Sequence, residues 1–295
     1  MISGSLFLGR EIDTKQIYSK YVLRLVIAYV VWSIFYAFLH RYSFNDGLIK
    51  VIKTYVGHMA AGQYHMWFIL MIIGLYIGIP IFHVISKDRN LARYFLILSF
   101  IFGIFLPWFL NLPADFIHSQ NLHKVINAIN SKINTMNVSV VLGFSFYFIL
   151  GHYLDNTELK INQRKLIYLL GLAGFFLTFF LTEILSLKTH APVGNYYGNM
   201  TLNVALEAIC IHTLFKYHTF NRKWLNRFFA NSSKYVFAIY LVHVFILQFI
   251  SFFGITSNYF NPILSIPAIS ISTFIIAYFI SLLLNKIPLV NKYCV

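Results

Sequence analysis

The stretch YVFAIYLVHVFILQFISFF, residues 235–253, contains no Lys, Arg, Asp or Glu. An α-helix needs about 20 mostly apolar residues to cross a hydrocarbon core of roughly 30 Å. A helix of this length on the surface of a soluble protein would show charged residues on its solvent face. The stretch therefore predicts a transmembrane helix.

Seven further windows have a similar length and apolar character: 22–40, 66–85, 93–110, 136–154, 165–186, 200–217 and 262–284. The window 200–217 is the weakest, because it is short and contains Asn203, Glu207 and His212. Unpaired backbone groups are costly in lipid, and the windows do not show the alternating pattern of barrel strands, so helices are expected. The sequence predicts an all-α polytopic bundle over residues 1–295, with eight complete spans after a partial span at residues 1–9.

The overall composition agrees with a bundle that contacts the lipid bilayer. The chain is 59% hydrophobic and 11% charged, with a mean hydropathy of +0.70. Soluble domains carry about a quarter charged residues, so this chain has too few to cover a water-facing surface. The net charge of +14 would suggest nucleic acid in a soluble protein. Here the basic residues are spread between the spans, and no nucleic-acid partner is expected.

The distribution of Lys and Arg between the predicted spans gives an orientation. If the segment containing Arg10 to Arg24 lies inside, alternation places 17 of the 23 basic residues on the cytoplasmic side. The outer segments hold the other six: Arg41, Lys50, Lys53, Lys124, Lys132 and Lys188. This asymmetry predicts a multi-pass protein of the plasma membrane with a cytoplasmic C-terminus.

Two carboxylates within the predicted spans are candidates for chemistry. Glu207 lies near the middle of its span, with Asn203 one turn earlier on the same face. A carboxylate at this depth is either a proton acceptor that serves catalysis or a paired structural residue. Glu183 lies near the outer end of its span, where it could contact substrate in a wet vestibule or be a plain interface residue.

Basic and aromatic residues form a second group of candidates. Arg24 enters a span from the cytoplasmic side, four residues after Lys20, and could hold a phosphate or snorkel to lipid. His65 precedes Trp67 at an outer interface, and histidine is the usual general base near neutral pH. His243 follows Tyr240 by three positions on one helical face. No Ser-His-Asp order, phosphate-binding glycine loop or metal-ligand spacing is evident, so no metal is expected.

Four stretches give the chain a resemblance to a known family. They are Met1-Ile2-Ser3-Gly4 with Leu8-Gly9-Arg10; Lys20 to Trp32; His65-Met66-Trp67-Phe68 with Gly74-Leu75-Tyr76 and Pro80; and Phe237 to His243. Gly143 through Gly151-His152-Tyr153 is a weaker fifth stretch. Their order and spacing resemble the membrane acyltransferase-3 family, which includes surface-polysaccharide O-acetyltransferases.

The resemblance implies transfer of an acetyl or other acyl group from cytoplasmic acyl-CoA, as donor substrate, to a hydroxyl of a cell-surface glycan. It implies no bound cofactor. It places catalytic roles on His65 and His243, and substrate contacts on Arg24, Trp67 and Tyr240. Lys20, Glu207 and Glu183 are added from the residue patterns above.

Two departures from the family pattern affect what is expected. Tyr21 and Ala28 replace an Arg and a Pro of the basic stretch, and the family's first helix, with its Arg and catalytic His, is missing before Met1. A truncated, inactive chain is therefore one expectation. The alternatives are a transporter or flippase for a glycan or lipid-linked precursor, although no paired broken helices of two related halves are visible, and a non-catalytic remnant or accessory subunit.

Overall fold

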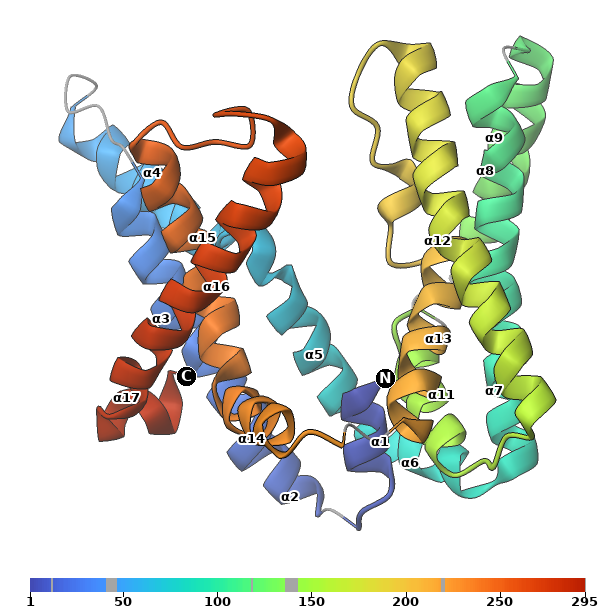
Figure 1. Ribbon diagram of the computed structural model, residues 1–295, viewed down its shortest axis with the longest axis horizontal. Helices are drawn as coiled ribbons and strands as arrows, with labels where there is room; N and C mark the ends of the chain where they lie inside the picture. Colours follow the sequence, from blue (N-terminus) through green and yellow to red (C-terminus); the bar gives the residue numbers. More distant parts are fainter. Residues whose placement is uncertain (12, 41–46, 118, 136–142, 219–220, 295) are drawn as a thin grey trace. The chain divides into compact units, whose positions relative to one another are not determined.

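A computed structural model describes the chain except for residues 12, 41–46, 118, 136–142, 219–220 and 295, and the side chain at 134. Every regular element in the described part is helical, which confirms the all-α prediction (Figure 1). The chain forms two compact units. Unit 1 comprises Met1–Ile12 and Gly78–Thr219, and unit 2 comprises Asp13–Ile77 and Phe220–Val295. The prediction of one domain over residues 1–295 stays a prediction.

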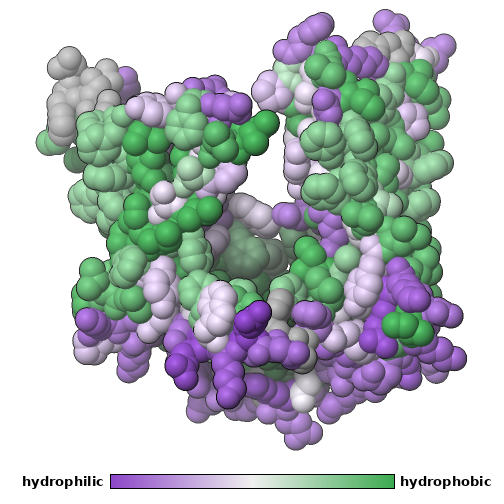
Figure 2. Space-filling view, viewed as in Figure 1, coloured by the Kyte–Doolittle hydropathy of each residue, from purple (hydrophilic) through white to green (hydrophobic). Residues whose placement is uncertain are grey.

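Six helical runs are long and apolar enough to cross a membrane. They are Thr14–Leu39, Leu48–Ile77, Arg89–Phe116, Ile161–Thr189, Lys223–Phe252 and Pro262–Asn285. On each unit, apolar side chains cover the flanks and hydrophilic ones gather toward the ends (Figure 2). An apolar flank of this kind is stable against lipid rather than water. The chain is a multi-pass membrane protein.

The structure differs from the eight predicted windows at two places, and a third window, 136–154, lies partly outside the described residues. Window 200–217 is helix α13 (Leu202–Tyr217), whose 16 residues fall short of the usual span. Window 66–85 is divided at Gly78 into α5 (Trp67–Ile77) and α6 (Ile79–Lys87), with Pro80 in the first turn of α6. The count of eight therefore stays a prediction.

Unit 2 is built around two helices that start at the ends predicted to be cytoplasmic. α3 (Leu23–Leu39) continues from α2 (Thr14–Gln16) and a π-helical turn, η1 (Ile17–Val22). α15 (Val236–Phe252) follows α14 (Lys223–Ser232) and a 3-10 turn, η6 (Ser233–Tyr235). The remaining elements are α4 (Leu48–Ala61), the 3-10 turn η3 (Tyr64–Met66), α5, α16 (Pro262–Asn285) and α17 (Pro288–Tyr293).

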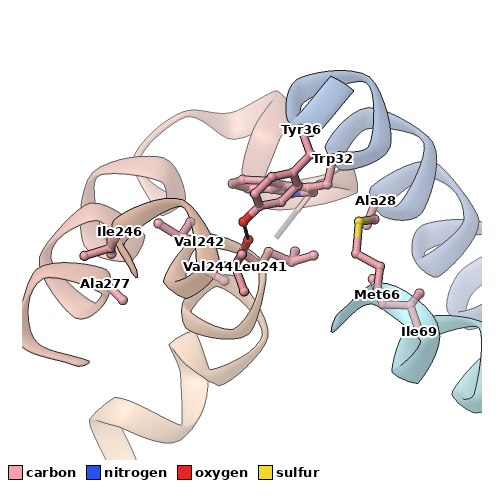
Figure 3. Packing of buried hydrophobic residues seen from close by; sticks show 11 residues of the cluster. Ala28, Trp32, Tyr36, Met66, Ile69, Leu241, Val242, Val244, Ile246 and Ala277 are labelled. Atoms are coloured by element: carbon pink, nitrogen blue, oxygen red, sulfur yellow. Dashed lines mark hydrogen bonds between the residues drawn. The ribbon is translucent and has the colours of Figure 1, made fainter. Parts of the chain in front are cut away.

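The core of unit 2 joins α3, the η3–α5 segment, α15 and α16. Its buried apolar residues are Ala28, Trp32, Tyr36, Met66, Ile69, Ala238, Leu241, Val242, Val244, Ile246 and Ala277 (Figure 3). The indole Nε1 of Trp32 donates to the carbonyl of Cys294 at 2.9 Å, which fastens the C-terminal segment to α3. This core fixes the positions of the histidines described below.

Unit 1 contains the long helix α12 (Ile161–Thr189), which packs along α13 (Figure 1). Gly171 and Gly174 of α12 allow this approach, since a Cβ at Gly171 would lie 2.2 Å from Cys210 Cβ and one at Gly174 2.6 Å from the Asn203 carbonyl. Small residues bring transmembrane helices close in this way. The other elements are α1 (Ile2–Leu8), α6, α7 (Arg89–Phe100), η4 (Ile101–Phe105), α8 (Leu106–Phe116), α9 (Gln120–Thr135), α11 (Ser145–Asp155) and η5 (Asn195–Tyr197).

Candidate active site

The sequence-predicted site residues divide between the two units. Unit 2 contains Lys20, Arg24, His65, Trp67, Tyr240 and His243, and unit 1 contains Glu183 and Glu207. Most of the candidates therefore lie in unit 2.

His65 and His243 meet in the interior of unit 2. Their ring centroids are 5.1 Å apart in an edge-to-face arrangement, and His65 is only 7% exposed. The two residues come from η3 and α15. The hydroxyl of Tyr240, one turn before His243, donates to the backbone carbonyl of His65 at 2.5 Å. Three of the predicted site residues thus form one cluster.

The hydrogen bonds of the two histidines differ. Nδ1 of His243 lies 2.6 Å from the carbonyl of Tyr240. A carbonyl oxygen can only accept, so Nδ1 carries a proton, and in the neutral imidazole Nε2 then has the free lone pair. Among the described residues, neither ring nitrogen of His65 has a hydrogen-bond partner. A buried polar group in this state is satisfied when a ligand or water reaches it.

Tyr36 of α3 forms one wall of the cluster, with its ring centroid 5.3 Å from that of His65. Its hydroxyl donates to the Leu241 carbonyl at 2.7 Å, drawn as a dashed line in Figure 3. The same hydroxyl accepts from the Phe245 backbone N–H at 3.2 Å. Both contacts hold the ring in place, so Tyr36 is a fixed side chain that packs against His65 and also lines the groove described next.

A polar groove of about 450 Å³ lies on the other side of Tyr36. Its lining residues are Tyr36, Ala37, Leu39, His40, His58, Gly62, Gln63, Gln248 and Phe252. The ring centroids of His40 and His58 lie 3.8 Å apart, with the two ring planes tilted by 36°. A second hollow of about 410 Å³ shares Gln248 and Phe252 with the groove and reaches Tyr64. Amide, imidazole, phenol and aromatic groups of this kind suit an uncharged polyhydroxyl ligand, and the volume falls in the usual range for ligand pockets.

The other predicted residues of unit 2 lie outside this cluster. Arg24 is exposed, and its guanidinium reaches the Asn291 carbonyl at 3.5 Å. Lys20 is exposed, with its ammonium 5.6 Å from the Tyr21 ring centroid. Trp67 is 45% exposed and packs edge-to-face on Phe68. Arg24 precedes Tyr36 by 12 residues on α3, which corresponds to ~18 Å along the helix axis.

Glu207 and Glu183 lie in unit 1. The Thr178 hydroxyl donates to Glu207 Oε1 at 2.5 Å, and the fully buried Asn203 donates to Thr178 Oγ1 and to the Tyr196 carbonyl, both at 2.7 Å. Glu207 therefore belongs to a polar network between α12 and α13. Glu183 is exposed on α12. Among the described residues no three His, Cys, Asp or Glu side chains come together in a metal-binding group.

Sequence reasoning missed the groove residues His40, His58, Gln63 and Gln248, and the wall residue Tyr36. The segment 41–65 contains three Tyr and two His, and this polar aromatic composition was a signal that could have found some of them. Gln248 gave a weaker signal, because a single amide in an apolar span has many structural explanations. Tyr36 could not be separated from ordinary interface tyrosines.

Comparison with known proteins adds to this geometry. Residues 1–282 match the family model described as an acyltransferase domain. The probable poly-beta-1,6-N-acetyl-D-glucosamine export proteins of Staphylococcus aureus strains MSSA476 and MW2 are each 28% identical over 265 residues, covering 85% of this chain and 67% of theirs. The protein of that name from strain MRSA252 is 27% identical over 264 residues, with the same coverage. No solved structure matches the chain.

Proposed function

The chain belongs to the acyltransferase-3 family of membrane proteins, and from this premise we propose that it transfers an acyl group from cytoplasmic acyl-CoA to a hydroxyl of a cell-surface glycan. The family match over residues 1–282 carries the reaction class. We place the reaction at the histidine cluster of unit 2, formed by His65 and His243. The glycan acceptor is supported by the names of the relatives and by the polar lining of the groove, which contains no Asp, Glu, Lys or Arg.

In this reaction the acceptor hydroxyl oxygen forms an ester bond with the acyl carbon. The carbon–sulfur bond of the thioester breaks, and the proton lost by the hydroxyl leaves with the CoA thiol. A base is required as the oxygen attacks. We assign this role to His243, whose Nδ1 hydrogen bond leaves Nε2 available. His65 lies beside His243, and its ring nitrogens have no hydrogen-bond partner among the described residues. It would orient the acceptor hydroxyl.

The two substrates would approach this base from opposite ends of α3. The groove lies at the C-terminal end of α3, which the charge distribution predicts to be the outer end. Arg24 and Lys20 lie toward the predicted cytoplasmic end, where their positive charges would attract the phosphates of CoA. The flexible arm of the donor would cover the ~18 Å between Arg24 and Tyr36. Trp67 and Tyr240 would contact substrate beside the histidines.

The test is acyl transfer by membranes that contain the full chain. Labelled acetyl-CoA is supplied with a β-1,6-linked N-acetylglucosamine oligosaccharide, and ester-linked label is counted after release with hydroxylamine. His243→Gln and His65→Gln are expected to lower transfer by about 100-fold or more, in the usual range for loss of a general base. His123→Gln, on the exposed surface of α9, is the matched control. Transfer no higher than in membranes lacking the chain, with acetyl-, propionyl- and succinyl-CoA alike, would contradict the proposal.

A second candidate function is export of the glycan itself, favoured by the name of the Staphylococcus aureus relatives. The polar groove would then hold polymer during its passage. The two functions differ in what is lost in cells that make the polymer. Export predicts that removal of the chain retains polymer inside the cell, whereas acyl transfer predicts normal polymer outside with fewer ester groups. The His243→Gln variant should leave export intact and remove the esters.

A further inference from the structure

Unit 1 contains a small polar hollow that the proposed function does not use. It has a volume of about 120 Å³ and lies where α6, α7 and α11 meet. Its lining residues are Ser86, Lys87, Arg89, Ala92, Ile149, His152, Tyr153, Asn156 and Thr157. Seven of these nine carry a polar or charged side chain. The volume is well below the roughly 300–1,000 Å³ of pockets for whole small-molecule ligands, so the hollow would hold a single chemical group.

Two arginines of α7 converge on a tyrosine at this hollow. The Nε of Arg93 donates to the Tyr153 hydroxyl at 2.8 Å, and the Arg89 guanidinium carbon lies 6.0 Å from the centroid of the same ring. Arg89 and Arg93 are one helical turn apart, so they lie on the same face of α7. Like charges in this arrangement repel each other unless an anion compensates them.

The carboxylates nearby in the sequence have other partners. Asp88 caps α7 by accepting from the backbone N–H groups of Asn90 and Leu91, at 2.8 and 3.1 Å. Asp155 lies 3.0 Å from Nε2 of His212. Within the described part of the chain, no carboxylate forms an ion pair with Lys87, Arg89 or Arg93. Lys87 and Arg89 thus line the hollow and Arg93 reaches its Tyr153, and none of the three has a carboxylate partner among the described residues.

We propose that this hollow binds a phosphate group. Guanidinium groups bind phosphate through paired, charge-assisted hydrogen bonds. The hydroxyls of Ser86 and Thr157 and the amide of Asn156 supply further donors around the same space. The proposal goes beyond acyl transfer and does not depend on it. Two sources share this chemistry: the phosphate of a soluble nucleotide and the headgroup of an anionic phospholipid.

The experiment uses the purified full chain in nanodiscs of neutral phosphatidylcholine. Adenosine 3′,5′-bisphosphate is titrated by calorimetry, and retained phosphatidylglycerol is counted by native mass spectrometry. The variant Arg89→Gln/Arg93→Gln is expected to weaken binding by about tenfold or more, because charge-assisted hydrogen bonds to phosphate are lost. The control Lys165→Gln/Lys223→Gln removes the same charge from exposed positions outside the hollow and should change binding by less than about twofold.

Each result bears on the proposal. If the Arg89→Gln/Arg93→Gln variant loses binding of the nucleotide only, or of the lipid only, the result supports the phosphate site and identifies which of the two supplies the phosphate. Failure of both probes to bind the unmodified chain, or equal weakening by the control, would overturn it in favour of diffuse surface charge. If the glutamine variant does not fold, Arg89→Lys/Arg93→Lys keeps the charge and removes the planar fork. Weakened binding in that variant supports the site, and unchanged binding overturns it.

Discussion

The Tyr36 hydroxyl and the Leu241 carbonyl are joined by a 2.7 Å hydrogen bond across 205 positions of sequence. The same hydroxyl accepts from the Phe245 backbone N–H. Leu241 and Phe245 are four residues apart, so these are the two groups that an α-helix pairs directly. Tyr36 therefore inserts its hydroxyl into the backbone ladder of α15, just beyond Tyr240. This links the wall of the groove to the helix that carries His243.

Tyr36→Phe removes that link while keeping the ring. We expect a loss of about 1–2 kcal/mol in the free energy of unfolding, because two buried backbone groups lose a partner. The measurement is the melting temperature of the solubilised chain, followed by tryptophan fluorescence. Tyr29→Phe is the matched control on α3, since its hydroxyl makes only an exposed 3.5 Å contact with the Ala61 carbonyl. Equal shifts in the two variants would show that the Tyr36 hydroxyl has no special role.

Gly171→Ala tests the close contact of α12 with α13. The new Cβ would lie 2.2 Å from Cys210 Cβ and 2.6 Å from its Sγ, so the helices must separate. A cost of about 1–3 kcal/mol is expected from overpacking. Gly57→Ala is the control, because nothing lies within 4 Å of its Cβ position in α4, and it should stabilise by about 0.5–1 kcal/mol. Adding Cys210→Gly to Gly171→Ala should restore part of the lost stability. If the double variant is no more stable than Gly171→Ala, the clash does not lie at Cys210.

Glu207→Gln separates the structural role of this side chain from its predicted catalytic one. The amide oxygen of Gln can still accept from Thr178, so the melting temperature should change little. Glu207→Leu removes this acceptor, while the Thr178 hydroxyl can still donate to the Gly174 carbonyl at 3.0 Å, so the cost should be about 0.5–1.5 kcal/mol. If Glu207 is the predicted proton acceptor, acyl transfer falls by about 100-fold in the Gln variant. Full activity in a stable Gln variant would end that prediction.

Tyr196 should make the stability of unit 1 depend on pH in the alkaline range. Burial, followed by the charge of Asp115 and its hydrogen bond from the Tyr196 hydroxyl at 3.0 Å, raises the pKa of Tyr196 above its ordinary value of 10.0. A raised pKa in the folded state means that this contribution is fully present below about pH 10 and is lost as the pH rises through the folded pKa.

The check compares the original chain with Tyr196→Phe between pH 7 and pH 11. The Phe variant should melt at a lower temperature at neutral pH, because the hydrogen bond to Asp115 is lost. The difference between the two chains should shrink above pH 10. A difference that stays constant over the whole range would contradict the assigned ionisation.

The transmembrane helices were predictable because apolar length is a property of each window. Residues 235–253 indicate a span wherever they are placed, and the structure contains a helix there, α15. The break at Gly78 was not anticipated, because the apolar pattern continues through it to residue 85. The helix Leu48–Ala61 was also missed, since its sequence was interpreted as an outer loop. Hydropathy measures the preference of a window for lipid, and it is insensitive to a local turn.

The sequence by itself determined an all-α membrane protein, an expected orientation and the histidines worth testing. Only the tertiary structure decided which of them meet. Tyr240 reaches the His65 carbonyl across 175 positions, and the groove combines residues from α3, α4, the segment between α4 and η3, and α15. It also gathered Arg89, Arg93 and Tyr153 at one hollow. The physical reason is that lipid preference adds up along a local window, whereas the convergence of side chains depends on how separate helices pack.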